Sequence, residues 1–250
     1  MTRQLLIRLN KYIADTGFTS RRKADDLIAN GKVKVDGKII KTLGLKIDPN
    51  NQVVTVNGTV LGSVEKIYLI LNKPRGYLTT LHDPSNRKTV MDLLKGINIR
   101  IYPVGRLDYN SEGLLILTND GDFAQNIIHP KFNILKTYEV KVSKKLTNSE
   151  LKNLGQKITV DGEQLSPHSV RIIERLPTKT WLEFRLHEGK NREIRRICKY
   201  HGLLVDKLRR VAIGGLSVKN LPVGKFQFLT KKKLLAEISK QYISPLKNLF

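Results

Sequence analysis

Cysteine is almost absent from this sequence, and the shortage excludes several kinds of protein. Cys198 is the only cysteine in 250 residues, so the sequence offers neither an intrachain disulfide nor a multi-cysteine zinc site. The 5 histidines show no H-x-x-x-H spacing, and "EGKNRE" lacks the upstream glycine and the Ser or Thr of a phosphate-binding Walker loop. We therefore expect no metal and no nucleotide cofactor.

Long apolar runs are missing as well. No stretch reaches the roughly 18 apolar residues that a membrane-spanning helix needs. The N-terminal residues include basic side chains but not the long apolar segment or cleavage site of a secretion signal. The sequence therefore predicts a cytoplasmic protein without a membrane partner.

Acidic residues are scarce beside basic ones. Lys and Arg total 45 against 22 for Asp and Glu, which gives a formal net charge of +23 at pH 7. Self-repulsion on this scale opposes folding unless a polyanion compensates it. Nucleic acid is the first candidate partner and an anionic membrane the second, and the missing apolar spans favour nucleic acid.

Residues 1–61 read as a small domain of two helices followed by short strands. Apolar residues at helical spacing predict a helix around Leu9–Ile13, and Ser20 is placed to cap a second one. Asp36-Gly37 and Asn57-Gly58 interrupt alternating segments and predict hairpin turns. A core this small leaves the surface of the domain as its useful part.

That surface is basic at one helix end. Arg21, Arg22 and Lys23 open the second helix, where free amides and the helix dipole already favour an anion. A solvated helix end is the alternative, but three cations there are unfavourable without a phosphate partner.

The stretch "RLNKYIADTGFTSRRKADDLIANGKVKVDGKII" resembles the small RNA-binding domain named after ribosomal protein S-four. The resemblance implies an RNA-binding module of the kind attached to many RNA-modifying enzymes. The expected RNA contacts in this domain are Arg8, Lys11, Arg21, Arg22, Lys23, Lys32 and Lys34.

A larger domain is expected over residues 66–236, followed by a basic tail at 237–250. Its strands come in runs with helices between only some of them, which predicts the α+β class. We expect a mixed, mainly antiparallel sheet with flanking helices behind a small α/β domain.

The stretch "GRLDYNSEGLLILTNDG" puts Asp108 in a loop that enters a buried strand. Leu114–Leu117 is a continuous apolar block between turn residues, as in a strand buried on both faces. Such a strand holds a loop side chain in fixed geometry, although an aspartate that caps a turn is the common alternative.

The helix expected over "NREIRRICKY" has an apolar face and a basic face. Arg195 and Arg196 lie next to the apolar stripe that includes Ile194. One of them could point partly inward, where it would need a carboxylate from another segment, and Asp108 is a candidate.

Five segments resemble motifs of one enzyme family, the RsuA-type ribosomal RNA pseudouridine synthases. In chain order they are "NKPRGYLTT", "GRLDYNSEGLLILTNDG", "KTYEVKV", "HEGKNREIRRI" and "LRRVAIGGL". Five motifs in the family's order are far more specific than one. The resemblance implies an isomerase that converts uridine to pseudouridine, and the alternative is a non-catalytic RNA-binding protein of ribosome assembly.

The resemblance also implies roles for individual residues. Asp108 matches the catalytic aspartate, Tyr138 the tyrosine that stacks on the base, Arg195 the basic partner of the aspartate, and Leu208 the aliphatic residue of the pocket. Ser111 stands where the family often has Thr. Further RNA contacts are expected from Lys73, Arg75, Arg106, Lys190, Arg192 and Arg196.

The implied reaction needs no redox change, group donor or energy source, which agrees with the missing cofactor motifs. The expected substrate is ribosomal RNA or a ribosome assembly intermediate, and we expect a monomer. The stretch "IYPVGRLDYNSEGLLILTNDGDFA" is closer to large-subunit members of the family than to small-subunit ones.

Overall fold

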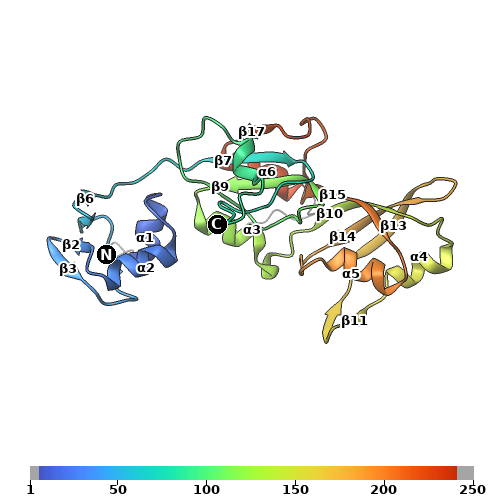
Figure 1. The fold of residues 1–250 in the computed structure, drawn as a ribbon, viewed down its shortest axis with the longest axis horizontal. Helices are drawn as coiled ribbons and strands as arrows, with labels where there is room; N and C mark the ends of the chain where they lie inside the picture. Colours follow the sequence, from blue (N-terminus) through green and yellow to red (C-terminus); the bar gives the residue numbers. More distant parts are fainter. Residues whose placement is uncertain (1–5, 241–250) are drawn as a thin grey trace. The chain divides into compact units, whose positions relative to one another are not determined.

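The computed structural model describes residues 6–240 (Figure 1). Its chain divides into two compact units: the first holds residues up to Lys66 with Ile97–Ile101 and Asn119–Gly121, and the second holds the remainder. No helix among the described residues has the length and apolar character to cross a membrane.

Short strands and two helices build the first unit. Its elements are β1 (Ile7–Arg8), α1 (Leu9–Asp15), α2 (Arg21–Ala29), β2 (Val33–Val35), β3 (Lys38–Ile40), β4 (Lys46–Ile47), β5 (Val54–Val56) and β6 (Thr59–Val60). The sheet has the order β3-β2-β5-β6, and β1 pairs with β4. Ile13 and Ile28 of the helices pack with Val33 and Val54 in one small core.

Local signals predicted this unit well. The Ser20 side chain accepts a hydrogen bond from the Lys23 amide and caps α2. Asp36-Gly37 and Asn57-Gly58 connect the two hairpins, and all four residues have positive φ. That backbone matches the tight turn that favours Asn-Gly and Asp-Gly pairs.

The second unit is a mixed sheet with flanking helices, as the sequence predicts. Its elements are β7 (Tyr68–Lys73), η1 (Val90–Leu93), β8 (Tyr102–Pro103), β9 (Glu112–Thr118), α3 (Gly121–Ile128), η2 (Pro130–Phe132), β10 (Lys136–Val142), α4 (Asn148–Leu154), β11 (Ile158–Val160), β12 (Glu163–Leu165), β13 (Ser169–Arg175), β14 (Thr180–Leu186), α5 (Glu193–Tyr200), β15 (Val205–Ile213), β16 (Leu216–Ser217), β17 (Phe226–Phe228) and α6 (Lys231–Ser239). The order of the main sheet is β13-β14-β10-β15-β9-β7-β17. Its β9–β15 pair is parallel, and the other neighbours on this path are antiparallel.

Strand β9 is the buried centre of this sheet. Leu114–Leu117 are fully buried, as expected for a strand covered on both faces. Helices α3 and α6 share a core with β7 and β9, to which they contribute Phe123 and Ile238. Helix α4 contacts β13 and α5 contacts β11, and Figure 1 shows both helices at the β13–β14 end of the sheet.

Helix α6 crosses the expected boundary between the larger domain and the tail. It continues to Ser239, and Ile238 is buried in the core of the second unit. Residues 237–240 are therefore part of the packed unit, and the rest of the expected tail lies outside the described residues. The other domain limits stay predictions.

Gly113 sets the close approach of β9 and β15. It has φ of +108°, and a Cβ at this position would lie 2.2 Å from the Arg210 carbonyl oxygen. Only glycine fits such a contact without a backbone shift. This contact brings the start of β9 directly against the middle of β15.

Candidate active site

A cavity of about 340 Å³ lies in the second unit, over strands β10 and β15. Its walls come from residues 104–108, which precede β9, and from residues 188–194, which lead into α5. The side chains of the two strands that line it include Lys136, Tyr138, Leu208 and Arg210.

Strand register explains why these four side chains meet. Tyr138 pairs with Arg210 in the β10–β15 ladder, and the next pair on that face joins Val140 to Leu208. Because side chains alternate along a strand, Lys136 and Tyr138 share a face, and so do Leu208 and Arg210. The ladder thus gives the cavity an aromatic, an aliphatic and two cationic neighbours.

Asp108 lies in the loop before β9 and lines the cavity wall. The nearby Ser111 amide donates to the Asp108 backbone carbonyl at 2.9 Å, not to its carboxylate. Among residues 6–240 the carboxylate caps no backbone amide. The turn-capping interpretation of Asp108 therefore lacks structural support.

Arg195 of α5 is the cation beside this carboxylate. Its Nε lies 3.7 Å from Asp108 Oδ2, and the two side chains are 16% and 30% exposed. Arg195 Nη2 donates to the Asn110 carbonyl at 3.2 Å. Burial lowers the pKa of Arg195, which Asp108 partly offsets. The sequence-based expectation that an inward arginine of this helix meets Asp108 agrees with this geometry.

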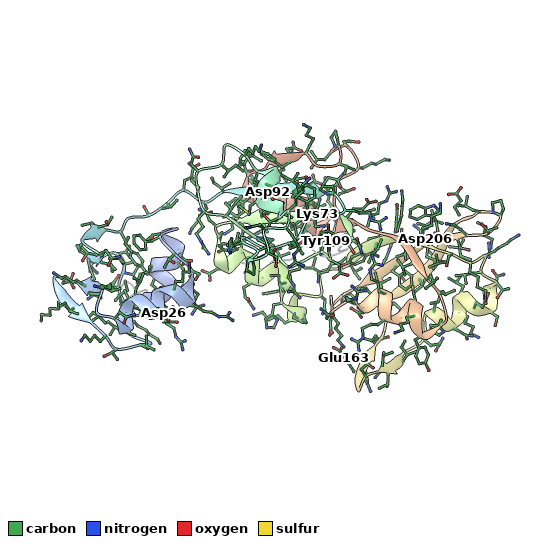
Figure 2. The ribbon with its side chains drawn as sticks, in the orientation of Figure 1. Asp26, Lys73, Asp92, Tyr109, Glu163 and Asp206 are labelled. Carbon is green, nitrogen blue, oxygen red and sulfur yellow. The ribbon has the colours of Figure 1, made fainter. Side chains whose placement is uncertain are left out.

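Lys73 holds the Asp108 loop through hydrogen bonds to its backbone. Its Nζ donates to the carbonyls of Ser111 at 2.8 Å, Pro74 at 3.0 Å and Asp108 at 3.2 Å. Figure 2 labels Lys73 and Tyr109 near each other in the second unit, and the Tyr109 carbonyl accepts from the Gly76 amide at 2.9 Å. Burial lowers the pKa of Lys73 to about 8.

The prediction that Lys73 contacts RNA is therefore wrong. Its side chain is fully buried, and its ammonium group donates its hydrogen bonds to three backbone carbonyls. The motif "NKPRG" does not indicate whether the side chain of its lysine is buried or exposed. Here the lysine fixes the loop that presents Asp108.

The far side of the cavity combines cations with a buried acid. Lys136 Nζ donates to the His187 carbonyl at 2.8 Å, and burial, with Arg210 nearby, lowers its pKa to about 8. Glu193 accepts a hydrogen bond from the Lys190 amide at 3.0 Å, and burial raises its pKa. A flat, uncharged ring with hydrogen-bonding oxygens suits this combination of an aromatic wall and donors.

Two family models match the chain. The model described as RNA pseudouridylate synthase matches residues 67–200, and the S4 domain model matches residues 7–53. The chain belongs to the RNA pseudouridylate synthase family. The S4 match confirms the RNA-binding domain expected at the N-terminus.

Relatives of this synthase align over nearly their whole length. It is 41% identical to an uncharacterized RNA pseudouridine synthase of Aquifex aeolicus, over 91% of this chain and 92% of the relative. It is 40% identical to ribosomal large subunit pseudouridine synthase B of Bacillus subtilis, over 89% of this chain and 92% of the relative. A crystal structure of a pseudouridylate synthase shares the fold with a TM-score of 0.66 at 24% identity, over 93% of this chain and 99% of that one.

The synthase thus converts uridine in RNA to pseudouridine, and no comparison favours the binding-only alternative. The structure brings the four expected catalytic residues together. Asp108, Tyr138 and Leu208 line the cavity, and Arg195 contacts Asp108 from the side.

The expected RNA contacts of the synthase fall into several groups. Arg106, Lys190 and Arg192 line the cavity, and Arg75 is exposed with Nη1 donating to the Asp206 carbonyl at 3.4 Å. In the first unit Lys11 is ion-paired with Asp15 at 2.8 Å. The remaining expected contacts of that unit are exposed: Arg8, Arg21, Arg22, Lys23, Lys32 and Lys34.

Arg196, also an expected RNA contact, bonds to another segment of the second unit. Its Nη1 lies 2.5 Å from Glu163 Oε2, and its Nη2 donates to the Val160 carbonyl at 2.7 Å. Both partners belong to the β11–β12 hairpin, so this arginine ties α5 to the hairpin.

Sequence reasoning missed several cavity residues: Lys136, Glu193, Arg210 and Ser111 in a lining role. The signal for two of them was present. Lys136 lies two positions before Tyr138, and Arg210 lies two positions after Leu208, so period-two alternation puts each beside an expected site residue.

Proposed function

We propose that this synthase isomerises a uridine of ribosomal RNA and that the large subunit supplies its target. The name of the Bacillus subtilis relative and the resemblance of the Asp108 region to large-subunit members support this substrate. The substrate is the free RNA or a subunit under assembly. A target in small-subunit RNA is the alternative.

Asp108 is the catalytic carboxylate of this proposal. The observation that carries it is a carboxylate in a cavity wall, 3.7 Å from the Arg195 guanidinium and free of any local capping contact among the described residues. The Arg195 guanidinium gives this carboxylate a positively charged neighbour. The carboxylate then attacks the ribose C1′ or the uracil ring, or it stabilises a ribose intermediate.

Tyr138 and Leu208 receive the base. A uracil must leave its stack to reach the cavity, and this costs a few kcal/mol. Stacking on the largely buried Tyr138 ring recovers part of that cost, and Leu208 adds an apolar surface beside it. The two residues thus hold the ring next to Asp108.

The phosphate backbone belongs at the edge of the cavity and on the first unit. Arg106 and Arg192 line the cavity yet are exposed, which suits contacts to phosphates on either side of the flipped nucleotide. Exposed Arg21, Arg22 and Lys23 at the start of α2 supply a further anchor.

The net reaction moves one bond from nitrogen to carbon within one nucleotide, so it consumes no co-substrate. We expect a monomer that acts without ATP or a bound transition metal. Activity on an rRNA fragment should survive a chelator once the RNA fold is kept by controlled magnesium. A strict need for a transition metal would contradict this expectation.

Mapping pseudouridines in rRNA from cells with and without the gene tests the substrate. The proposal expects the loss of a pseudouridine in large-subunit RNA and its return with the wild-type gene, but not with Asp108→Asn. Loss from small-subunit RNA instead would select the alternative. Unchanged ribosomal RNA would refute the ribosomal substrate.

A further inference from the structure

The floor of the cavity contains a buried arginine that the roles assigned above leave unused. Arg210 is 4% exposed and lines the cavity. Its Nε donates to the Leu114 carbonyl at 2.8 Å, which fixes the guanidinium in place. Its Nη2 is buried and has no hydrogen-bond partner within residues 6–240.

Ser111 repeats this pattern in the same cavity. It is 1% exposed, and its Oγ has no hydrogen-bond partner in the described part of the chain. The two residues are neighbours in space, since Arg210 pairs with Gly113 at the start of β9. An unsatisfied buried polar group costs about 1–3 kcal/mol. Two in one cavity indicate groups reserved for a ligand.

Packing alone explains Arg210 poorly. Its hydrogen bond to Leu114 uses one of its five N–H donors. The charged groups that act on Lys136 here are Arg210, Glu193 and Glu188, and Arg210 helps to lower the pKa of Lys136. A second cation beside Lys136 is unfavourable until an electronegative group arrives between them.

We propose that Arg210 Nη2 donates a hydrogen bond to a carbonyl oxygen of the uracil and stabilises the negative charge that develops there. This inference rests on the proposed function. Tyr138, on which the base is placed, is the ladder partner of Arg210, and both residues line the cavity, so a stacked ring would lie beside the guanidinium. A phosphate is the poorer ligand because Arg106 and Arg192, which are exposed, are better placed than this buried position for the RNA backbone.

The chemistry of isomerisation gives this donor a purpose. The N1–C1′ bond breaks, a C5–C1′ bond forms, C5 loses a proton and N1 gains one, so atoms and electrons balance without another reactant. When the electron pair of the broken bond stays on the base, negative charge spreads onto O2 and O4. A fixed guanidinium at one of these oxygens stabilises the charged base more than neutral uridine, which accelerates the step.

Thio-substituted RNA tests the contact directly. Single-turnover rates would be measured on an rRNA fragment whose target is uridine, 2-thiouridine or 4-thiouridine, because sulfur accepts hydrogen bonds weakly. We expect wild type to lose about tenfold in rate on one of the two thio substrates. Arg210→Met should lose about 100-fold on uridine and show less than about threefold further loss on that thio substrate.

A matched control lies one residue away. Arg209 is exposed on the opposite face of β15 and pairs with Glu139. Arg209→Met should keep the wild-type rate and the full thio penalty. If Arg210 had only a structural role, Arg210→Met would lower the rates on all three substrates alike and would leave the thio penalty unchanged.

The outcomes separate this inference from the proposed function. Equal wild-type rates on all three substrates would overturn the Arg210 contact while leaving the proposed function intact. This comparison uses wild type alone, so it does not depend on whether a variant folds. An unchanged thio penalty in folded Arg210→Met would overturn it as well. No pseudouridine from wild type on ribosomal RNA would overturn the proposed function first, and this inference with it.

Discussion

At the scale of single residues, the site depends on buried cations with distinct partners. Lys73 bonds to backbone carbonyls, Arg195 contacts Asp108, and Arg210 keeps an unused donor in the cavity. In a chain so rich in Lys and Arg, charge alone does not separate RNA-binding residues from structural ones. Burial and hydrogen-bond partners do.

Replacing Lys73 should reveal its buried charge through the pH dependence of stability. Folding lowers the pKa of Lys73 from 10.5 to about 8, so between these values the unfolded chain binds more protons than the folded one. The unfolding free energy of wild type therefore rises with pH there, by up to about 1.4 kcal/mol per pH unit from this group.

Lys73→Met removes that slope and leaves carbonyls without a donor, so it should also be less stable by about 1–3 kcal/mol. Urea unfolding of both proteins at about pH 8 and about pH 9.5 measures the effect, because all other groups cancel in the difference. The advantage of wild type should widen at the higher pH. A constant difference would show that Lys73 has an ordinary pKa.

At the scale of elements, local sequence signals predicted several turns, caps and strands, whereas the pairing of distant strands could not be predicted from them. The cap at Ser20, the hairpin turns and the buried strand β9 follow from residues near each other in sequence. The parallel β9–β15 pair joins segments about a hundred residues apart, and no local pattern specifies it. Helix periodicity named Asp108 only as a candidate partner of Arg195 or Arg196, and the family resemblance selected Arg195.

Gly113 tests how tightly the β9–β15 pair is packed. A Cβ there would lie 2.2 Å from the Arg210 carbonyl oxygen, at a φ of +108°. Gly113→Ala should lower the unfolding free energy by about 3 kcal/mol or more and reduce turnover, because β9 carries the Asp108 loop.

Gly62→Ala is the matched control, since nothing lies within 4 Å of an added Cβ at this position. Its unfolding free energy should stay within about 0.5 kcal/mol of wild type. Urea unfolding measures both variants. Equal stability of the two would show that the strands separate easily at Gly113.

At the scale of the whole molecule, the work divides between two units. The second unit contains the complete cavity, and the first has the S4 match and exposed cations at the start of α2. The formal net charge of +23 is spread over both. We therefore expect the first unit to contribute affinity for RNA and the second to contribute the chemistry.

Neutralising Arg21, Arg22 and Lys23 to alanine should weaken binding and flatten its salt dependence. Each lost phosphate contact lowers the slope of log affinity against log salt by about 0.7 to 0.9, so three contacts account for about 2 to 3. The rate at saturating RNA should stay near that of wild type.

The charge-matched control replaces Lys231, Lys232 and Lys233, which are also exposed in the first turn of a helix. Binding titrations at several salt concentrations compare the two triple variants. If both lower the slope equally, net charge alone explains the affinity and the first unit is no specific anchor.

The Asp108→Asn variant tests the proposed catalytic role of Asp108. Asn keeps the size of the side chain but removes its charge and nucleophilicity, and it would cap a turn about as well as Asp. Asp161→Asn is the control, because Asp161 is 86% exposed and its positive φ suits Asn equally. Single-turnover assays on the mapped rRNA fragment, beside binding titrations at fixed salt, give the comparison. We expect Asp108→Asn to fold, to bind RNA nearly as well as wild type and to form no detectable pseudouridine. Turnover within about tenfold of wild type, a barrier change of only about 1.4 kcal/mol, would contradict it.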